Sequence, residues 1–340
     1  MSQSRREQLG QVEEEDWSSF MCSDGTAFGR HEEMILNISG GRMSSRSYID
    51  GYSNEGGRQQ ISIQCVSALS PLDMIDMYNG SQDATGNRVW TGALLFLEAF
   101  VRPLPVKVDA PFVADDDESK DDEQPSSTST KNDCVAMQTK LSELRTQAFK
   151  NKAIIELGCG TGISGIFLVV ADVDTPLTVT FTDFDKSALD LCKKNCESNI
   201  DDKSRYSTQQ LEWGSSLPDG IEDESFDTVI ATDVLYDISS LATLMHAASQ
   251  LVKVGGYFIL SHVPRASVEA DDEATESTAV ASADILENLI VMEAEKQGLC
   301  TESFLRPSEL SCIWDGKSLN KASFAAMDSV GSAVLVFRKQ

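Results

Sequence analysis

The amino-acid sequence predicts an α/β fold built on a mostly parallel β-sheet. Short apolar runs alternate with helical segments through the second half of the chain. A glycine-rich motif, ELGCGTG at 156–162, separates one of these runs from a helix. No helix is predicted between the last two runs. Strands joined by helices form parallel sheets covered on both faces, whereas the last strand is expected to enter antiparallel.

The elements of the main sheet follow from these runs. Seven strands are predicted at 153–157, 177–183, 206–213, 226–232, 257–262, 300–305 and 332–339. The helix after the glycines is expected to end near residue 171, and further helices are expected at 185–199, 239–252 and 283–297. Asp185 is the expected N-cap of the helix that begins there, because its short side chain can accept a backbone N–H.

A smaller segment precedes this sheet. Apolar runs at 34–38 and 61–66 flank a stretch rich in glycine, serine and arginine, which predicts a β-hairpin with a long loop. Residues 89–101 predict a helix with leucines on one face, and Pro103 ends it.

Composition divides the chain into four regions. Seven acidic residues lie between Asp115 and Glu123 and are followed by a Ser/Thr tract, which favours a flexible linker over a site for a basic partner. The regions are a disordered tail at 1–30, the hairpin and helix at 31–108, an acidic Ser/Thr-rich linker at 109–135, and the main domain at 136–340.

The net charge limits the classes of partner. Lys and Arg number 28 against 54 Asp and Glu, a formal charge of −26. Since phosphate backbones attract basic surfaces, nucleic acid is not expected, and a protein partner with a basic surface fits better. No apolar run approaches the ~20 residues that cross a bilayer, and the N-terminus lacks the apolar core of a signal peptide. We therefore expect no membrane association and a cytoplasmic monomer, with the nucleus as an alternative location.

The eight cysteines show no spacing typical of a disulfide framework. Cys192 and Cys196 can share one helix face, but no further ligands complete a tetrahedral site. We expect reduced thiols and no metal.

The glycine motif indicates a ligand site. Glycines allow the backbone to turn sharply and to approach a ligand closely. The spacing of Gly158, Gly160 and Gly162 differs from the G-x-G-x-x-G pattern of nicotinamide dinucleotide sites. Glu156, two places before the first glycine, suits a ligand that carries an ammonium group. Asp183 ends the next strand and can accept hydrogen bonds from ribose hydroxyls.

Further segments make the pattern more specific. FTD at 181–183, LEWG at 211–214 and TDVLYD at 232–237 accompany the glycine motif, and ISIQ at 61–64 and TGNRVWTGALLFLEAF at 85–100 lie upstream. Together these segments resemble methyltransferase family 16, which contains protein-lysine methyltransferases. The glycine motif alone is shared by all Rossmann-like methyltransferases, whereas its combination with LEWG and D-x-x-Y is much more specific.

The resemblance implies a Rossmann-like class I methyltransferase with a seven-stranded sheet, an N-terminal β-hairpin and S-adenosylmethionine as cofactor. Trp213 would border the adenine, and Trp90 would lie over the methionine end. Thr91 and Thr232 occupy positions where the family more often has other residues. The cofactor-binding residues that the resemblance implies are Trp90, Gly158, Cys159, Gly160, Asp183, Trp213 and Thr232.

Asp233 and Tyr236 are the candidate catalytic residues. They follow the strand at 226–232, and open α/β sheets bind ligands at the carboxyl ends of their strands. Both could hold a lysine amine in line with a methyl donor. The alternative is that Asp233 caps the helix beginning near 239 and that Tyr236 packs.

These observations favour methyl transfer to a protein side chain, with lysine as the preferred acceptor. The alternatives are a histidine or small-molecule methyltransferase and a non-catalytic cofactor-binding adaptor, and a dehydrogenase is less favoured than either. None of the three histidines is paired with a nucleophile in sequence, so acyl transfer is poorly supported.

Overall fold

The computed structural model describes residues 31–39, 42–46, 59–66, 84–100, 127–170, 174–264, 276–311, 327–328 and 330–340. Within these ranges, no helix is long and apolar enough to span a membrane. The tail predicted at 1–30 and the part of the acidic linker from 109 to 126 lie outside the described residues.

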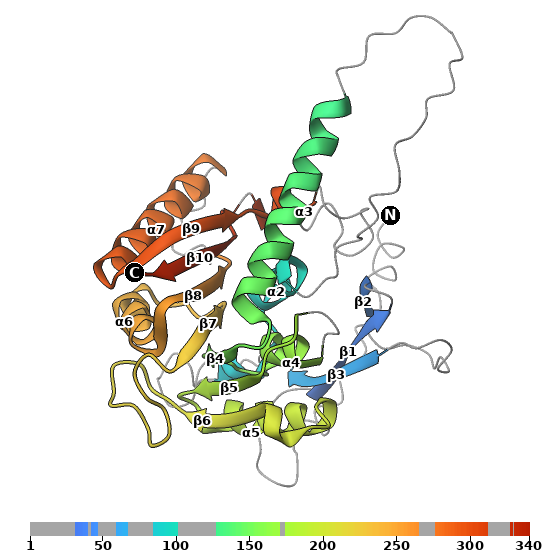
Figure 1. Ribbon diagram of the computed structural model, residues 1–340, viewed down its shortest axis with the longest axis vertical. Coiled ribbons are helices and arrows are strands. Elements are labelled where there is room, and N and C mark those ends of the chain that lie inside the picture. The colour runs from blue at the N-terminus through green and yellow to red at the C-terminus, as the bar shows by residue number, and fades with distance from the viewer. Residues whose placement is uncertain are drawn as a thin grey trace, which may run out of the picture.

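Seven strands form the central sheet, in the spatial order β6-β5-β4-β7-β8-β10-β9 (Figure 1). Pairing is parallel from β6 through β8, whereas β10 is antiparallel to both β8 and β9. The predicted mostly parallel sheet with an antiparallel last strand is therefore confirmed. The strands are β4 (Ala153–Leu157), β5 (Thr178–Asp183), β6 (Tyr206–Gln210), β7 (Phe226–Thr232), β8 (Val252–His262), β9 (Leu299–Leu305) and β10 (Ala333–Lys339).

Helices cover both faces of this sheet (Figure 1). Successive strand residues point to opposite faces, so Ile154 packs with one helical layer and Ile155 with the other. The first layer contains α2 (Thr91–Phe100), α3 (Ser127–Phe149), α4 (Ile163–Val170) and α5 (Lys186–Asn199). The second contains α6 (Leu241–Leu251) and α7 (Glu276–Lys296).

An aromatic cluster joins α2 to α3. The ring centroids of Phe96 and Phe100 lie 5.2 Å apart, and both rings meet Phe149 edge-on at 6.1 and 5.3 Å. All three side chains are fully buried, and each stabilises the fold by about 1.5–3 kcal/mol relative to an exposed ring. This cluster anchors the helix that follows Trp90.

A second sheet of three strands has the order β2-β1-β3. β1 (His31–Ser39) pairs antiparallel with β3 (Gln59–Val66), as the predicted hairpin requires. β2 (Arg42–Arg46) lies in the stretch predicted to be a loop. It pairs antiparallel with β1. Its sequence has no alternation of apolar and polar residues, so the sequence pattern did not predict a strand there.

Two further elements differ from the sequence prediction. Helix α3 begins at Ser127, so residues 127–135 are helical and not linker. Among its described side chains, which start at Val135, Leu141 is the first that is buried. The segment 127–135 is polar in sequence, so its composition resembles that of a linker. Helix α8 (Pro307–Ser311) follows β9, although no helix is predicted between the last two strands. β10 nevertheless runs antiparallel to β9.

Candidate active site

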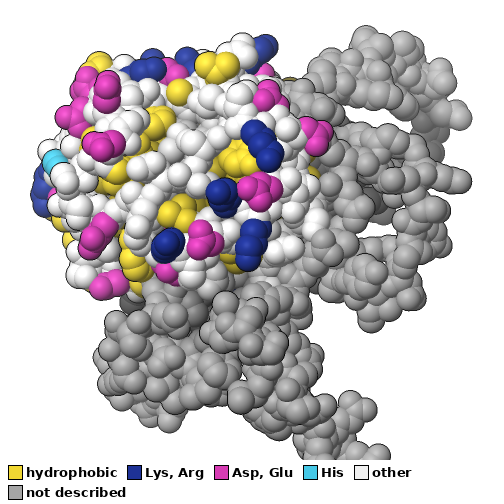
Figure 2. Space-filling view, turned by 90° about the horizontal axis from the view of Figure 1, so that it is seen from below, with side chains coloured by type: hydrophobic (Ala, Val, Ile, Leu, Met, Phe, Trp, Pro, Cys, Tyr) yellow, Lys and Arg dark blue, Asp and Glu magenta, His cyan; other side chains and the backbone are white. Residues whose placement is uncertain are grey.

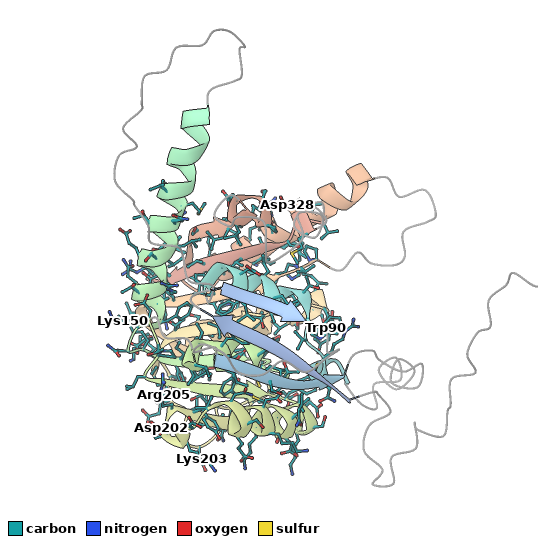
Figure 3. All side chains as sticks on the ribbon, turned by 90° about the vertical axis from the view of Figure 1, so that its right-hand side faces the viewer. Trp90, Lys150, Asp202, Lys203, Arg205 and Asp328 are labelled. Carbon is teal, nitrogen blue, oxygen red and sulfur yellow. The ribbon has the colours of Figure 1, made fainter. Side chains whose placement is uncertain are left out.

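A cavity of about 310 Å³ opens at the carboxyl ends of β4, β5 and β7. The strand order reverses between β4 and β7, and ligands of open α/β sheets bind at such a reversal. Figure 3 shows Trp90 on the side of the fold opposite Lys150, which lies just before β4. The cavity is lined by all nine predicted site residues, namely Trp90, Gly158, Cys159, Gly160, Asp183, Trp213, Thr232, Asp233 and Tyr236.

The glycine loop forms the floor of the cavity. Gly158 and Gly160 have φ angles of +62° and +50°, in the left-handed region that favours glycine. A Cβ atom on Gly160 would lie 2.8 Å from the carbonyl oxygen of Gly86. The second glycine is thus required both by its own backbone conformation and by the approach of the segment that precedes α2.

Asp183 lines the cavity beside the glycine loop. Its side chain is 6% exposed; Oδ2 accepts the Gly160 N–H at 3.0 Å and Oδ1 accepts the Asp185 N–H at 3.0 Å. Each carboxylate oxygen can accept more than one hydrogen bond. These contacts therefore hold the carboxylate in place and leave it able to accept from ligand hydroxyls. Asp185 in turn caps α5, as predicted, by accepting the Ser187 N–H at 2.9 Å.

Asp233 lies near the start of α2, which approaches β7 from a distant part of the chain. Its side chain is 7% exposed; Oδ2 accepts the Gly92 N–H at 3.1 Å and Oδ1 accepts the Val263 N–H at 3.3 Å. Its φ of +58° is unusual for a residue other than glycine, and such strained residues cluster at functional sites.

The alternative role suggested for Asp233, capping the helix near 239, is wrong. Asp237 performs that function by accepting the Ser239 N–H at 2.9 Å. Tyr236 is 47% exposed at the cavity and does not pack in the core. The carboxylate of Asp233 instead supports the start of α2 while it lines the cavity.

Two tryptophans line the cavity from different layers. Trp213 packs against the core cluster beneath α6, and a Cβ atom on Gly158 would lie 3.5 Å from its ring. Trp90 lies beneath the guanidinium of Arg88, whose Cζ is 5.0 Å from the ring centroid. Thr232 lies 3.2 Å from the Ser164 hydroxyl, measured between the two Oγ atoms, which joins β7 to α4.

Glu156 does not line the cavity. The expectation that it faces an ammonium-bearing ligand is therefore unsupported. It is fully buried on β4, where Oε2 accepts the Gly165 N–H at 3.0 Å. Burial raises its pKa from 4.5 to about 8, against the opposing effect of this hydrogen bond. Glu156 supports the first turn of α4 from below the loop.

The thiol of Cys159 is a neutral part of the lining. Burial raises its pKa to about 11, so it remains protonated at neutral pH. Cys192 and Cys196 are buried on α5 as free thiols. In the part of the chain that the structure describes, no three His, Cys, Asp or Glu side chains are grouped so that they could hold a metal ion.

Several lining residues were not predicted. Arg88 precedes Trp90 by two residues, and Phe184 follows Asp183, so each lies beside a residue that the motifs did identify. Arg88 could have been proposed as a ligand-binding residue for its positive charge, and Phe184 for its aromatic ring, which is half exposed. Glu212, which also lines the cavity, could have been proposed because it lies next to Trp213 in the LEWG motif.

The chain is similar in sequence to known lysine methyltransferases. Residues 126–274 match the family model described as lysine methyltransferase. A protein N-lysine methyltransferase of Xenopus tropicalis is 34% identical over 107 residues, 30% of this chain and 46% of that protein. The EEF1A lysine methyltransferase 3 of Mus musculus is 29% identical, over 36% of this chain and 50% of that protein. The chain thus spans about half the length of these curated relatives.

A histidine protein methyltransferase 1 homologue of Dictyostelium discoideum is 26% identical, over 31% of this chain and 33% of that protein. Among solved structures, a geranyl diphosphate methyltransferase is 11% identical with a TM-score of 0.41, over 64% of this chain and 93% of that chain. The fold assignment therefore rests on the sheet order itself.

Proposed function

We propose that this chain transfers a methyl group from S-adenosylmethionine to a protein side chain, with lysine as the favoured acceptor. The match of residues 126–274 to the lysine methyltransferase family model supports the proposal. The observation that carries the proposal is the cavity on the glycine loop, with Asp183 and Asp233 both in its lining. When bound, the cofactor supplies a methyl group on a positively charged sulfur, which is already activated for displacement.

The lining fits this cofactor part by part. Asp183 can accept both ribose hydroxyls, and Trp213 offers an aromatic face to the adenine. Arg88 is the one cation among the described lining residues, and a guanidinium suits the carboxylate of the methionine part. The contact of the Arg88 guanidinium with the Trp90 ring limits the movement of the Arg88 side chain before a ligand binds.

The segment 86–92 sets the order of these groups. Gly86 contacts Gly160 close to Asp183, since a Cβ atom added to Gly86 would lie 3.9 Å from its Oδ2. Gly92 contacts Asp233 at the start of α2. Arg88 and Trp90 lie between these contacts in sequence, so the methionine part would lie between the ribose and the acceptor.

The acceptor is expected to be a cation before transfer. Five carboxylates line the cavity, from Asp183, Asp185, Glu212, Asp233 and Asp237, against the single cation of Arg88. Their field attracts an ammonium group to the site. This attraction comes from the lining and not from net charge alone, because the face over α5 and β6 mixes basic and acidic side chains (Figure 2).

Asp233 would hold and orient the amine and would not deprotonate it. A lysine has a pKa near 10.4, so about 0.1% is neutral at pH 7.4, and reaching that form costs ~4 kcal/mol. A carboxylate favours the charged form, so the proton must leave to solvent at the open side, where Tyr236 is half exposed. Alignment of the amine then supplies the main acceleration.

The test is incubation with methyl-labelled cofactor and a whole-cell extract, followed by identification of the labelled residue by mass spectrometry. Labelled lysine supports the proposal. Labelled histidine or a labelled small molecule would establish one of the alternative activities. Tight binding of S-adenosylhomocysteine with no labelling in any extract would favour the adaptor.

The proposal also covers the substrate surface, the oligomeric state and the location of the enzyme. We propose a protein substrate with a basic surface around the acceptor, a monomeric enzyme, and a cytoplasmic location with the nucleus as the alternative. Ultracentrifugation tests the monomer, and fractionation of the source cells tests the location.

A further inference from the structure

Two asparagines on α5 face the edge of the three-stranded sheet. Asn195 Oδ1 accepts the Gln64 N–H at 2.9 Å, and its Nδ2 donates to the Gln64 carbonyl at 3.1 Å. One turn later, Asn199 Oδ1 accepts the Ser62 N–H at 2.8 Å, and its Nδ2 donates to the Ser62 carbonyl at 2.7 Å. Each side-chain amide therefore satisfies both backbone groups of one strand residue.

This arrangement replaces a missing strand. β3 is at the edge of its sheet, with β1 on one side only. Alternate residues of an edge strand direct their backbone groups outward, at intervals of about 6.6 Å. Residues four apart on a helix are separated by about 6 Å along its axis. Asn195 and Asn199 therefore match the spacing of Ser62 and Gln64, and α5 completes the edge.

Asn195 makes a further contact that Asn199 does not. Its Nδ2 also donates to the Thr161 carbonyl at 2.9 Å, in the glycine loop. The side chain is fully buried, and it joins segments 131 and 34 residues away in sequence. The second donor bond of Asn199 goes to the Asn195 carbonyl, within α5.

The loop residue at the end of this connection belongs to the site. Thr161 lines the cavity beside Gly160. Gly86, Arg88 and Trp90, which follow β3 in sequence, line the same cavity. The Asn195 side chain thus connects β3 to the glycine loop of this cavity.

We propose that Asn195 is a positioning residue that couples docking of the N-terminal sheet to the shape of the glycine loop. Cofactor binding then stabilises the docked sheet, and docking strengthens cofactor binding by the same factor. This inference rests on the proposed function, since the ligand concerned is the methyl-donor cofactor.

The experiment compares Asn195→Ala with Asn199→Ala in the full chain. Both substitutions remove two hydrogen bonds to β3, but only the first removes the bond to Thr161. We expect both variants to exchange amide hydrogens faster at residues 61–65. Asn195→Ala should weaken S-adenosylhomocysteine binding about tenfold, the scale of one neutral hydrogen bond, whereas Asn199→Ala should change it less than threefold.

Hydrogen exchange with and without ligand supplies a second test. S-adenosylhomocysteine should slow exchange at residues 61–65 in the wild type and in Asn199→Ala, but not in Asn195→Ala. Equal affinity losses in the two variants, or no slowing in the wild type despite tight binding, would overturn the coupling and leave the proposed function intact. Failure of the wild type to bind the ligand would remove the proposed function as well.

Discussion

Two buried aspartates line the cavity, and they are held in different ways. Asp183 accepts backbone N–H groups from residues 23 and 2 positions away. Asp233 accepts them from residues 141 and 30 positions away. The first is fixed by one local strand–loop–helix unit, whereas the second joins the end of β7 to the start of α2 and to the chain after β8. Under the proposed function, ligand binding by Asp183 depends on a local unit, whereas acceptor alignment by Asp233 depends on the assembled fold.

The largest effect is expected at the Asp233 end. Asp233→Asn keeps the shape of the side chain but removes its charge, and its amide nitrogen cannot accept one of the two backbone N–H groups. Turnover should fall about 10²-fold or more, the range of lost charge and alignment. S-adenosylhomocysteine affinity, measured by calorimetry, should change less than about threefold, because Asp183 and the glycine loop are intact. Dichroism checks that the variant folds, and full turnover would return Asp233 to a structural role alone.

The Asp183 end should show the opposite pattern. Asp183→Ala removes the acceptor for the ribose hydroxyls, and charge-assisted hydrogen bonds contribute about 1.5–3 kcal/mol each. S-adenosylhomocysteine affinity should therefore fall at least tenfold, while turnover at saturating cofactor should fall less than in Asp233→Asn. Unchanged affinity would mean that the glycine loop holds a different ligand.

Arg88 tests a third part of the cavity, because it lies in sequence between Gly86, which contacts Gly160 near Asp183, and Gly92, which contacts Asp233. Arg88→Gln should weaken S-adenosylmethionine binding about tenfold, since one charged hydrogen bond is lost. Binding of decarboxylated S-adenosylmethionine should not change, and Arg88→Lys should keep part of the affinity. If both ligands weaken equally in Arg88→Gln, the residue acts only by holding Trp90.

The remaining prediction concerns stability and its dependence on pH, and not activity. Glu156 has a pKa of about 8 in the folded chain against 4.5 ordinarily. The folded chain keeps a proton that the unfolded chain releases above about pH 4.5. This stabilisation is complete below that pH and is lost as pH rises to 8, by at most ~1.4 kcal/mol per pH unit.

Glu156→Gln cannot lose a proton, so its stability should improve relative to the wild type as pH rises. Urea unfolding at pH 5.5 and 8.5 measures the difference. If the difference in unfolding free energy between Glu156→Gln and the wild type is the same at pH 5.5 and pH 8.5, Glu156 has an ordinary pKa in the folded chain.

The same contrast explains what the sequence could predict. The strand at 153–157, the glycine loop and Asp183 form a continuous local pattern, and their placement agrees with the prediction. The Asp233–Gly92 and Asn195–Thr161 contacts join residues far apart in sequence, and no local pattern reveals such pairs. The capping role suggested for Asp233 was wrong for this reason, because a local partner was considered and the actual partners are distant.

Helix α3 and strand β2 were missed for a different physical reason. Both elements are held by contacts made elsewhere, through Leu141 and the following turns for α3 and through pairing with β1 for β2. Their own composition is polar, so periodicity gives little signal. The nine candidate site residues, by contrast, line one cavity as the motifs predicted.

In the proposed mechanism, one cavity binds the cofactor beside Asp183 and aligns the acceptor beside Asp233. The most direct test is single-turnover methyl transfer with saturating labelled cofactor, combined with calorimetry, on the wild type, Asp183→Ala and Asp233→Asn. We predict that Asp233→Asn loses transfer and keeps cofactor affinity, whereas Asp183→Ala loses affinity and keeps most of the transfer rate at saturation. Equal losses of both quantities in both variants would contradict this division.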